Sequence, residues 1–374
     1  MKRTLLSLFL MAALLVPAAS AAYSHSHGQE EGLPTYHTAD WAKEEVREAW
    51  SLGLLPDNLP EDYRTPITRG EFCRMLLSYL AAQWNTDPDT LVDLVNFHRG
   101  DYDADGLLVQ AFADADAACT AAFHLGLVQG KAPGIFDPDG PLTRQEAAVM
   151  LVRAQESLGF VPPDSIPAAT YQDEASIAPW AAESVALLSQ WKVMQGTGGN
   201  TFSPASSLTV QECAVLSLRL HQKAPMGAHN VSPLFSLEET KAYLQNLEDQ
   251  ADQNHAGFRK VLELDGPQAT LIRMDWSGTI QATSRLYLLY PDGGLQALDL
   301  GLCLRFGMLT PDLLLENPRF SQDGGTFLCE VRLTQDSVDN TSGTPVVTHE
   351  KGLYHVSVDL STRQVTLDRT ALPG

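Results

Sequence analysis

The chain has 374 residues, a hydrophobic fraction of 44% and a formal net charge of -21. The hydrophobic fraction is ordinary for globular cores, and the length predicts two or three domains. So acidic a chain is repelled by nucleic acid and by anionic lipid, which we exclude as general partners. An anionic partner of another kind requires local cationic points or a bound cation.

The N-terminus is typical of an export signal. Lys2 and Arg3 precede an apolar run over residues 5–16, and small residues at 19–21 supply a cleavage pattern. The run is too short to span a bilayer, which needs about 20 apolar residues. We therefore predict a signal peptide over 1–21, a flexible leader over 22–37, and a secreted mature chain with no membrane span.

The cysteines do not form a disulfide framework. Five of them stand at wide spacing, and an odd number of this kind predicts other roles. Three fall at or beside apolar helix positions and are expected in the core: Cys73, Cys119 and Cys213. Cys303 and Cys329 lie in two strand-like segments. Whether these two pair is left open, because the sequence does not give the distance between them.

Three segments carry one apolar pattern. The spacing is i, i+4, i+7 and i+8, which is one face of an α-helix. The three sets are Ala42, Val46, Ala49 and Trp50; Ala115, Cys119, Ala122 and Phe123; and Ala181, Val185, Leu188 and Ser189. Each set predicts an amphipathic helix, and its recurrence indicates an internal repeat.

A second helix is predicted behind each of these, and it begins with a capping box. Thr and Glu stand three residues apart, so the Thr hydroxyl can accept from the N3 amide while the Glu reaches back to the Thr amide. The pairs are Thr68 and Glu71, Thr143 and Glu146, and Thr209 and Glu212. One helix pair is too small to bury its own apolar face, so the three should pack together as an all-α bundle.

Further residues make this region similar to the S-layer homology family. They are Trp41-Ala42 and Trp180-Ala181 at the first helices, Phe136-Asp137-Pro138 and Phe202-Ser203-Pro204 before the second helices, and the Thr-Arg-x-Glu helix starts. The similarity runs from Thr38 to Lys223. The first copy lacks the Phe-x-Pro element. We place the three repeats at 38–84, 111–160 and 161–223.

The resemblance implies a surface protein held at a bacterial cell wall. It implies a bundle of three helix pairs with grooves between them. It also implies non-covalent binding to a secondary cell-wall polysaccharide, typically one that carries pyruvate ketals. The expected localisation is therefore the cell wall or cell surface, and other surface proteins are possible partners.

The family's motif Arg falls on Arg69 and Arg144, whereas Val210 stands at that position in the third copy. A helix N-terminus with a guanidinium beside it makes an anion site, which suits a pyruvyl carboxylate. The alternative is a solvated first-turn Arg paired with a nearby acid. The second copy also lacks the Trp, since Asp114 stands at the place of Trp41.

The remaining candidates for polysaccharide binding each have a structural alternative. Trp41 and Trp180 either stack on sugar or pack in the core. The capping residues Thr68, Glu71, Thr143 and Glu146 contact the polysaccharide or serve only as caps. We expect no cofactor.

An insertion over 85–110 separates the first two repeats. Asp101, Asp103 and Asp105 resemble the start of a calcium loop. The twelfth position is Phe112, so the bidentate carboxylate of such loops is missing. We therefore favour a solvated acidic loop without metal.

The rest of the chain predicts a linker over 224–235 and a mainly antiparallel β-rich domain over 236–374. A helix starts at Ser236 with Glu239 as its capping partner. Strands with period-2 alternation or turn signals follow. They lie at 285–290, 326–333, 354–360 and 364–367.

This C-terminal domain carries none of the common catalytic motifs, such as G-x-S-x-G, H-E-x-x-H or a Walker loop. Asp275, Asp299 and Asp359 are candidate acids for glycan hydrolysis. His349 and His355 have no nucleophile that the sequence identifies as their partner. We therefore expect a wall-attachment protein rather than an enzyme, with a surface hydrolase or a ligand sensor as the alternatives.

Overall fold

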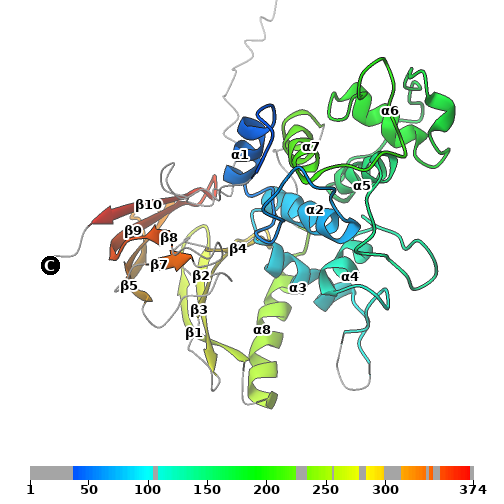
Figure 1. Ribbon diagram of the computed structural model, residues 1–374. Helices are drawn as coiled ribbons and strands as arrows, with labels where there is room; N and C mark the ends of the chain where they lie inside the picture. The colour runs from blue at the N-terminus through cyan, green and yellow to red at the C-terminus, as the bar shows by residue number, and fades with distance from the viewer. Residues whose placement is uncertain are drawn as a thin grey trace, which may run out of the picture.

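The computed structural model describes residues 37–103, 108–224, 234–254, 257–277, 284–298, 313–333, 337–339 and 346–370. The predicted signal peptide lies outside the described residues, as do most of the leader and of the linker, and Cys303. Helices occupy the first part of the described chain and antiparallel strands the second (Figure 1). The predicted fold class, helical bundle followed by β domain, is confirmed.

Three helix pairs correspond to the three repeats, and we name them units 1, 2 and 3. Unit 1 holds α1 (Lys43–Ser51) and α2 (Arg69–Gln83), unit 2 holds α4 (Ala117–His124) and α5 (Arg144–Ser157), and unit 3 holds α6 (Ala182–Gln190) and α7 (Val210–Lys223). A short 3-10 turn, η1 (Glu174–Ser176), precedes α6. All three capping boxes are present. The apolar residue before each box is fully buried: Ile67, Leu142 and Leu208.

The three units close into a ring. The first helix of each unit packs on the second helix of the preceding one: α4 on α2, α6 on α5, and α1 back on α7. Three backbone amides repeat this circuit at the centre. Ile67 donates to the carbonyl of Leu208 at 2.9 Å, Leu208 to Leu142 at 3.2 Å, and Leu142 to Ile67 at 3.3 Å. The expected joint packing of the units is therefore present, and it is cyclic.

The insertion between units 1 and 2 contains a helix that we did not predict, α3 (Pro88–Arg99). Asp87 caps it by accepting from the amide of Thr90 at 2.9 Å, and Pro88 stands at the first helical position, where its missing N–H costs nothing. Leu91, Leu94 and Val95 are buried on its inner side.

The C-terminal part starts with α8 (Leu237–Asn254), whose predicted capping box forms between Ser236 and Glu239. Two four-stranded antiparallel sheets follow. The first sheet contains β1 (Gly257–Asp265), β2 (Thr270–Ser277), β3 (Ser284–Leu289) and β4 (Leu295–Ala297) in that order. The second has the order β10-β9-β6-β5, from β5 (Leu313–Phe320), β6 (Thr326–Leu333), β9 (Gly352–Asp359) and β10 (Val365–Thr370). A short pair, β7 (Ser337–Asp339) and β8 (Val346–His349), stands apart.

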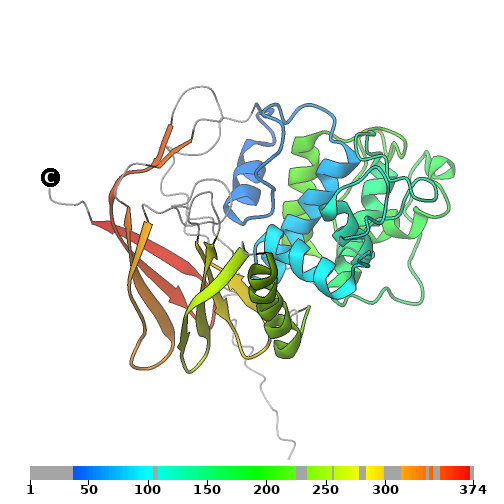
Figure 2. The ribbon, with the colours of Figure 1, turned by 90° about the horizontal axis from the view of Figure 1, so that it is seen from below.

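The first sheet contributes to two apolar cores, as the period-2 alternation of side chains allows. Met274 and Tyr287 join the core of the helical part, whereas Leu271 and Leu288 point into a second core shared with Phe327 of the other sheet. Helices, first sheet and second sheet therefore form successive layers (Figure 2).

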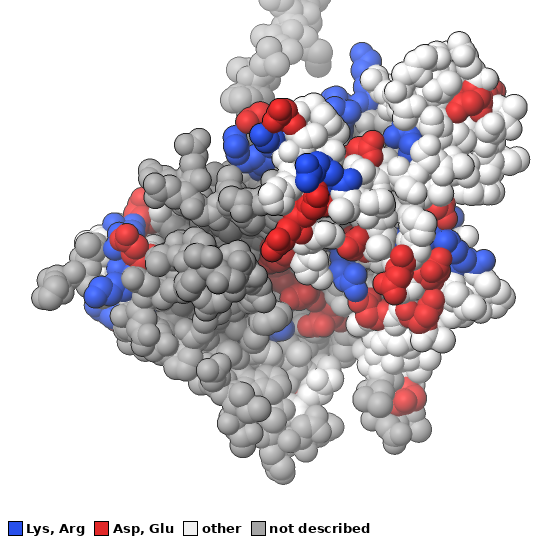
Figure 3. All heavy atoms as spheres, viewed as in Figure 1, with Lys and Arg blue, Asp and Glu red and all other residues white. Residues whose placement is uncertain are grey.

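The face of the molecule drawn in Figure 3 shows no separate basic patch among the described residues. On the described residues in view, Lys and Arg are interspersed with Asp and Glu over the helical part (Figure 3). Among the described residues, no helix is both long and apolar enough to cross a membrane.

Candidate functional site

The two motif arginines occupy equivalent buried seats in the following unit. The Nε atom of Arg144 donates to the carbonyl of Phe202 at 2.9 Å, its Nη2 donates to Gln195 at 2.7 Å, and its guanidinium lies 5.0 Å from the ring centroid of Phe202. Arg69 does the same at Phe136 and Gln129, with distances of 3.1, 3.3 and 4.8 Å. The Phe-x-Pro element and the nearby Gln carbonyl thus bind the Arg of the preceding unit, and we call this binding place the Arg seat.

Both arginines are buried: Arg69 is 5% exposed and Arg144 is 7% exposed. The alternative of a solvated first-turn Arg is therefore wrong for both, although Arg69 does pair with an acid, Glu146, as that alternative expected. Burial lowers the pKa of the Arg144 guanidinium, and the nearby carboxylate of Glu212 opposes that shift.

The surroundings of Val210 explain why unit 3 has no Arg at this position. The backbone contacts of this position are kept, because the Val210 amide donates to Thr65 at 3.0 Å as the Arg144 amide donates to Ser206 at 2.9 Å. Unit 1, however, has no Phe-x-Pro element that could seat a guanidinium. Val210 is fully buried instead, so an apolar side chain takes a place where an Arg would lack its acceptors.

An aspartate fixes each Phe-x-Pro element. Asp173 accepts from the amides of Phe202 and Ser203 at 2.7 Å each, and Asp114 accepts from those of Phe136 and Asp137 at 2.8 Å each. Asp114, although aligned with Trp41 in the sequence, is thus the structural counterpart of Asp173. Sequence reasoning missed this pair, although an aromatic residue stands two positions before each: Phe112 and Tyr171.

The backbone amides hold the pKa of Asp173 below its usual value. A carboxylate with a depressed folded pKa adds stability above its unfolded pKa of about 3.9, and this contribution is lost as the pH falls through the folded pKa. We expect Asp173→Ala to unfold at lower urea concentration than the wild type at pH 7, and the gap in midpoint to narrow toward pH 2. Circular dichroism at a series of pH values measures the gap; a gap independent of pH would contradict this role.

The two tryptophans named as candidates for polysaccharide binding lie at the surface: Trp41 is 56% exposed and Trp180 is 58% exposed. The core-packing alternative is therefore wrong for both. Each Trp stands two residues after a backbone amide that donates a hydrogen bond to a Gln side chain. The amide of Ala39 donates to Gln211 at 2.9 Å, and that of Ala178 donates to Gln145 at 3.0 Å. The indoles are thus held beside the second helix of the preceding unit.

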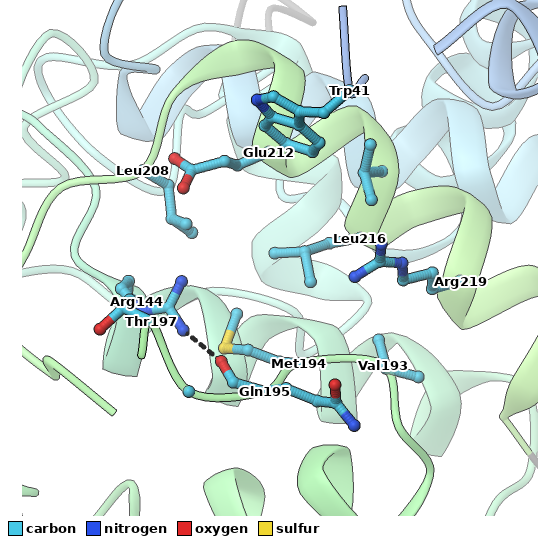
Figure 4. A pocket seen from close by; sticks show the side chains of 12 residues that line it. Trp41, Arg144, Val193, Met194, Gln195, Thr197, Leu208, Glu212, Leu216 and Arg219 are labelled. Atoms are coloured by element: carbon cyan, nitrogen blue, oxygen red, sulfur yellow. Dashed lines mark hydrogen bonds between the residues drawn. The ribbon is translucent and has the colours of Figure 1, made fainter. Parts of the chain in front are cut away.

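Trp41 and Arg144 meet at one cavity of about 220 Å³, which we name the α7 groove. Unit 1 supplies Trp41, unit 2 supplies Arg144, and unit 3 supplies the other lining residues. Figure 4 shows Trp41 and Glu212 on one side, Met194 and Gln195 opposite them, and Arg144 near one end. This groove contains residues from all three units, which are brought together by ring closure.

The polar groups of the α7 groove suit an anionic sugar. Arg144 presents Nη1, for which the described residues provide no hydrogen-bond partner, and Glu212 uses only Oε2 in its capping box. Arg219 is positioned by Glu45 of α1 through two hydrogen bonds of 3.0 and 3.2 Å. A guanidinium edge binds a carboxylate, a carboxylate accepts from hydroxyls, and an exposed indole stacks on a sugar face.

A tight turn forms the floor of the groove. A Cβ atom added to Gly196 would come within 2.6 Å of the Thr201 carbonyl oxygen. A Cβ atom added to Gly130 in unit 2 would come equally close to the Ile135 carbonyl oxygen. Glycine is therefore needed at both places by close backbone approach. Sequence reasoning missed this Gln-Gly pair, Gln195-Gly196 and Gln129-Gly130, although it recurs at the same place in both units.

Those of the other candidates that the structure describes are not gathered into a site. No group of metal-ligating residues occurs within the described part of the chain; Asp101 and Asp103 belong to that part, whereas Asp105 and Asp299 do not. Asp275 is bonded to Arg273 at 2.8 Å, and Asp359 accepts from Ser361 and Thr362 in a turn. His355 lies 3.7 Å from Glu330 on the second sheet, and the side chain of His349 is not described.

The helical part is a repeat-built ring of three helix pairs, two of which place an Arg in the next unit. Two segments of the chain, residues 119–148 and 170–209, match the S-layer homology domain. The chain thus carries S-layer homology sequence in these two segments, and this domain indicates a cell-surface protein associated with the cell wall.

Curated relatives are glycan-acting enzymes by name. The chain is 26% identical over 187 residues both to an amylopullulanase of Thermoanaerobacterium thermosulfurigenes and to exoglucanase XynX of Acetivibrio thermocellus. These matches cover 50% of this chain but 9% and 16% of the two relatives. An endoglucanase of Bacillus sp. (strain KSM-635) is 24% identical over 276 residues, which are 72% of this chain and 26% of the relative. The chain thus spans only a minor part of each relative.

Proposed function

We propose that the protein anchors itself non-covalently to the cell wall by binding an anionic, pyruvylated secondary cell-wall polysaccharide in the α7 groove. The observation that carries the proposal is the meeting of an exposed Trp41 with the Nη1 edge of Arg144 across one cavity. An indole face and a guanidinium edge together recognise a sugar that carries a carboxylate.

The net charge supports a specific rather than a general attraction. A chain with a formal charge of -21 is repelled by an acidic polymer at long range. Binding therefore depends on the few cations that line the groove, and added salt should weaken it less than it weakens the binding of a basic protein. The Arg144 guanidinium, buried among protein carbonyls, is little screened by salt.

The test is sedimentation of the full mature chain with purified cell walls, before and after acid extraction of the secondary polymer. We expect the protein to pellet with intact walls and to remain in the supernatant with extracted walls. Walls treated to remove only the pyruvate ketals should bind as poorly as extracted walls. Equal pelleting with intact and extracted walls would sink the proposal, since the ligand would then be peptidoglycan itself.

A further inference from the structure

The repeat places an equivalent set of residues beside α5, with Trp180, Arg69 and Glu146 as the counterparts of Trp41, Arg144 and Glu212. The correspondence rests on matched contacts. Arg69 reaches Gln129 as Arg144 reaches Gln195, and Gln145 clamps the Trp180 segment as Gln211 clamps the Trp41 segment. We name this place the α5 groove.

The two grooves differ at one pair of atoms. In the α5 groove, Nη1 of Arg69 forms an ion pair with Oε1 of Glu146 at 3.1 Å. All three nitrogens of Arg69 are then engaged, and both oxygens of Glu146 as well, because Oε2 accepts from Thr143. In the α7 groove the counterpart atoms, Nη1 of Arg144 and Oε1 of Glu212, have no partner within the described part of the chain.

The ion pair of the α5 groove is costly to open. The side chains of Arg69 and Glu146 are 6% and 23% exposed, so separating the charges leaves a buried guanidinium without its counterion. A ligand carboxylate must displace the Glu146 carboxylate to reach Nη1, whereas at Arg144 it displaces only water. The same ligand therefore binds the α5 groove more weakly, even where its other contacts are alike.

The residues that border the two grooves also differ, and again the ion pair is found at the α5 groove. Lys131 forms an ion pair with Asp137 at 2.7 Å beside the α5 groove, whereas the counterparts Thr197 and Ser203 form a hydroxyl pair at 2.9 Å. Lys131, one of the cations near this place, is thus also engaged.

We infer that the protein has a single open binding groove, the α7 groove, and that Glu146 latches the α5 groove shut by occupying Arg69. The third position of the ring has Val210 in place of Arg and adds no guanidinium. This inference rests on the proposed function. It assigns Glu146 a role as a specificity-determining residue rather than a ligand contact.

The experiment is isothermal titration calorimetry, in which a methyl hexopyranoside that carries a 4,6-linked pyruvate ketal is added to the full mature chain. The titration gives the number of binding sites per chain and their affinity. We expect one site per chain for the wild type, one site of about tenfold lower affinity for Trp41→Ala, and one unchanged site for Trp180→Ala. Glu146→Gln keeps an oxygen that can cap Thr143 but removes the negative charge, so we expect a second site to appear in this variant. Glu71→Gln makes the same change in unit 1 opposite Val210, and it should leave one site.

The possible failures are distinguishable. If the wild type binds no probe, the proposed function is overturned. If the wild type binds two molecules, or if Trp180→Ala and Trp41→Ala each remove one, binding stands and only the latch is overturned. The same holds if Glu146→Gln still binds only one molecule while circular dichroism shows that this variant is folded under the conditions of the titration.

Discussion

Replacement of Arg144 by Ala should lower the free energy of unfolding by about 4 kcal/mol. The variant loses two hydrogen bonds from a charged group to buried carbonyls, each worth about 1.5–3 kcal/mol, and a cation–π contact with Phe202 worth about 1 kcal/mol. It also leaves the carbonyls of Phe202 and Gln195 without their donor. Urea titration followed by circular dichroism measures the loss.

Two further variants separate the guanidinium from simple bulk. Arg144→Lys should recover little of the loss, because one ammonium cannot reach both carbonyls in the fork geometry. Val210→Ala, at the same position of unit 3, should cost only about 2 kcal/mol, the value for truncating a buried apolar side chain. If Arg144→Ala costs less than Val210→Ala, the seat is not a major source of stability. A loss of wall binding in Arg variants must therefore be compared with their folded fraction.

Replacement of Trp41 by Ala should instead weaken wall binding about tenfold while the free energy of unfolding changes by less than about 0.5 kcal/mol. The indole is more than half exposed, so it contributes little to the core. Stacking of an aromatic ring on a ligand is worth about 1.5 kcal/mol, which corresponds to tenfold in affinity. Binding isotherms from wall sedimentation measure the change.

The aromatic series gives this prediction its control. Trp41→Phe keeps a ring face and should retain most of the affinity, whereas Trp41→Leu keeps apolar area without a ring and should behave like Ala. Equal affinity for all three variants and the wild type would show that the indole does not face the polymer. A large fall in the urea midpoint would show that Trp41 is structural after all.

Local signals in the sequence predict the units of this fold well. The capping boxes at Thr68, Thr143 and Thr209 depend only on residues three positions apart, and all three form as expected. The Ser236 box predicts the start of α8 for the same reason. Helix α3 was missed although its Asp87-Pro88 start is an equally local signal.

Contacts between distant residues are what the sequence conceals. The acceptors of Arg69 lie at Gln129 and Phe136, more than 50 positions along the chain, and nothing near Arg69 indicates a carbonyl seat rather than solvent. The equivalence of Asp114 with Asp173 is hidden by a shorter connection in unit 2. The open or latched state of a groove depends on one ion pair between units, which only the packed ring reveals.

The cyclic arrangement of α1 on α7 has a consequence for how such a module can be combined with others. A linear repeat array can lengthen at either end, but a closed circuit has no free end, so the number of helix pairs is fixed at three. Helices α1 and α7 lie side by side in the same direction, since Ala39 contacts Gln211 and Glu48 contacts Gln222, so the segment that enters α1 and the segment that leaves α7 lie at opposite ends of this pair. Rejoining the helical part in a new order, 2-3-1, should therefore preserve the contacts within it only if the new connection from unit 3 to unit 1 spans the length of α7, about 20 Å.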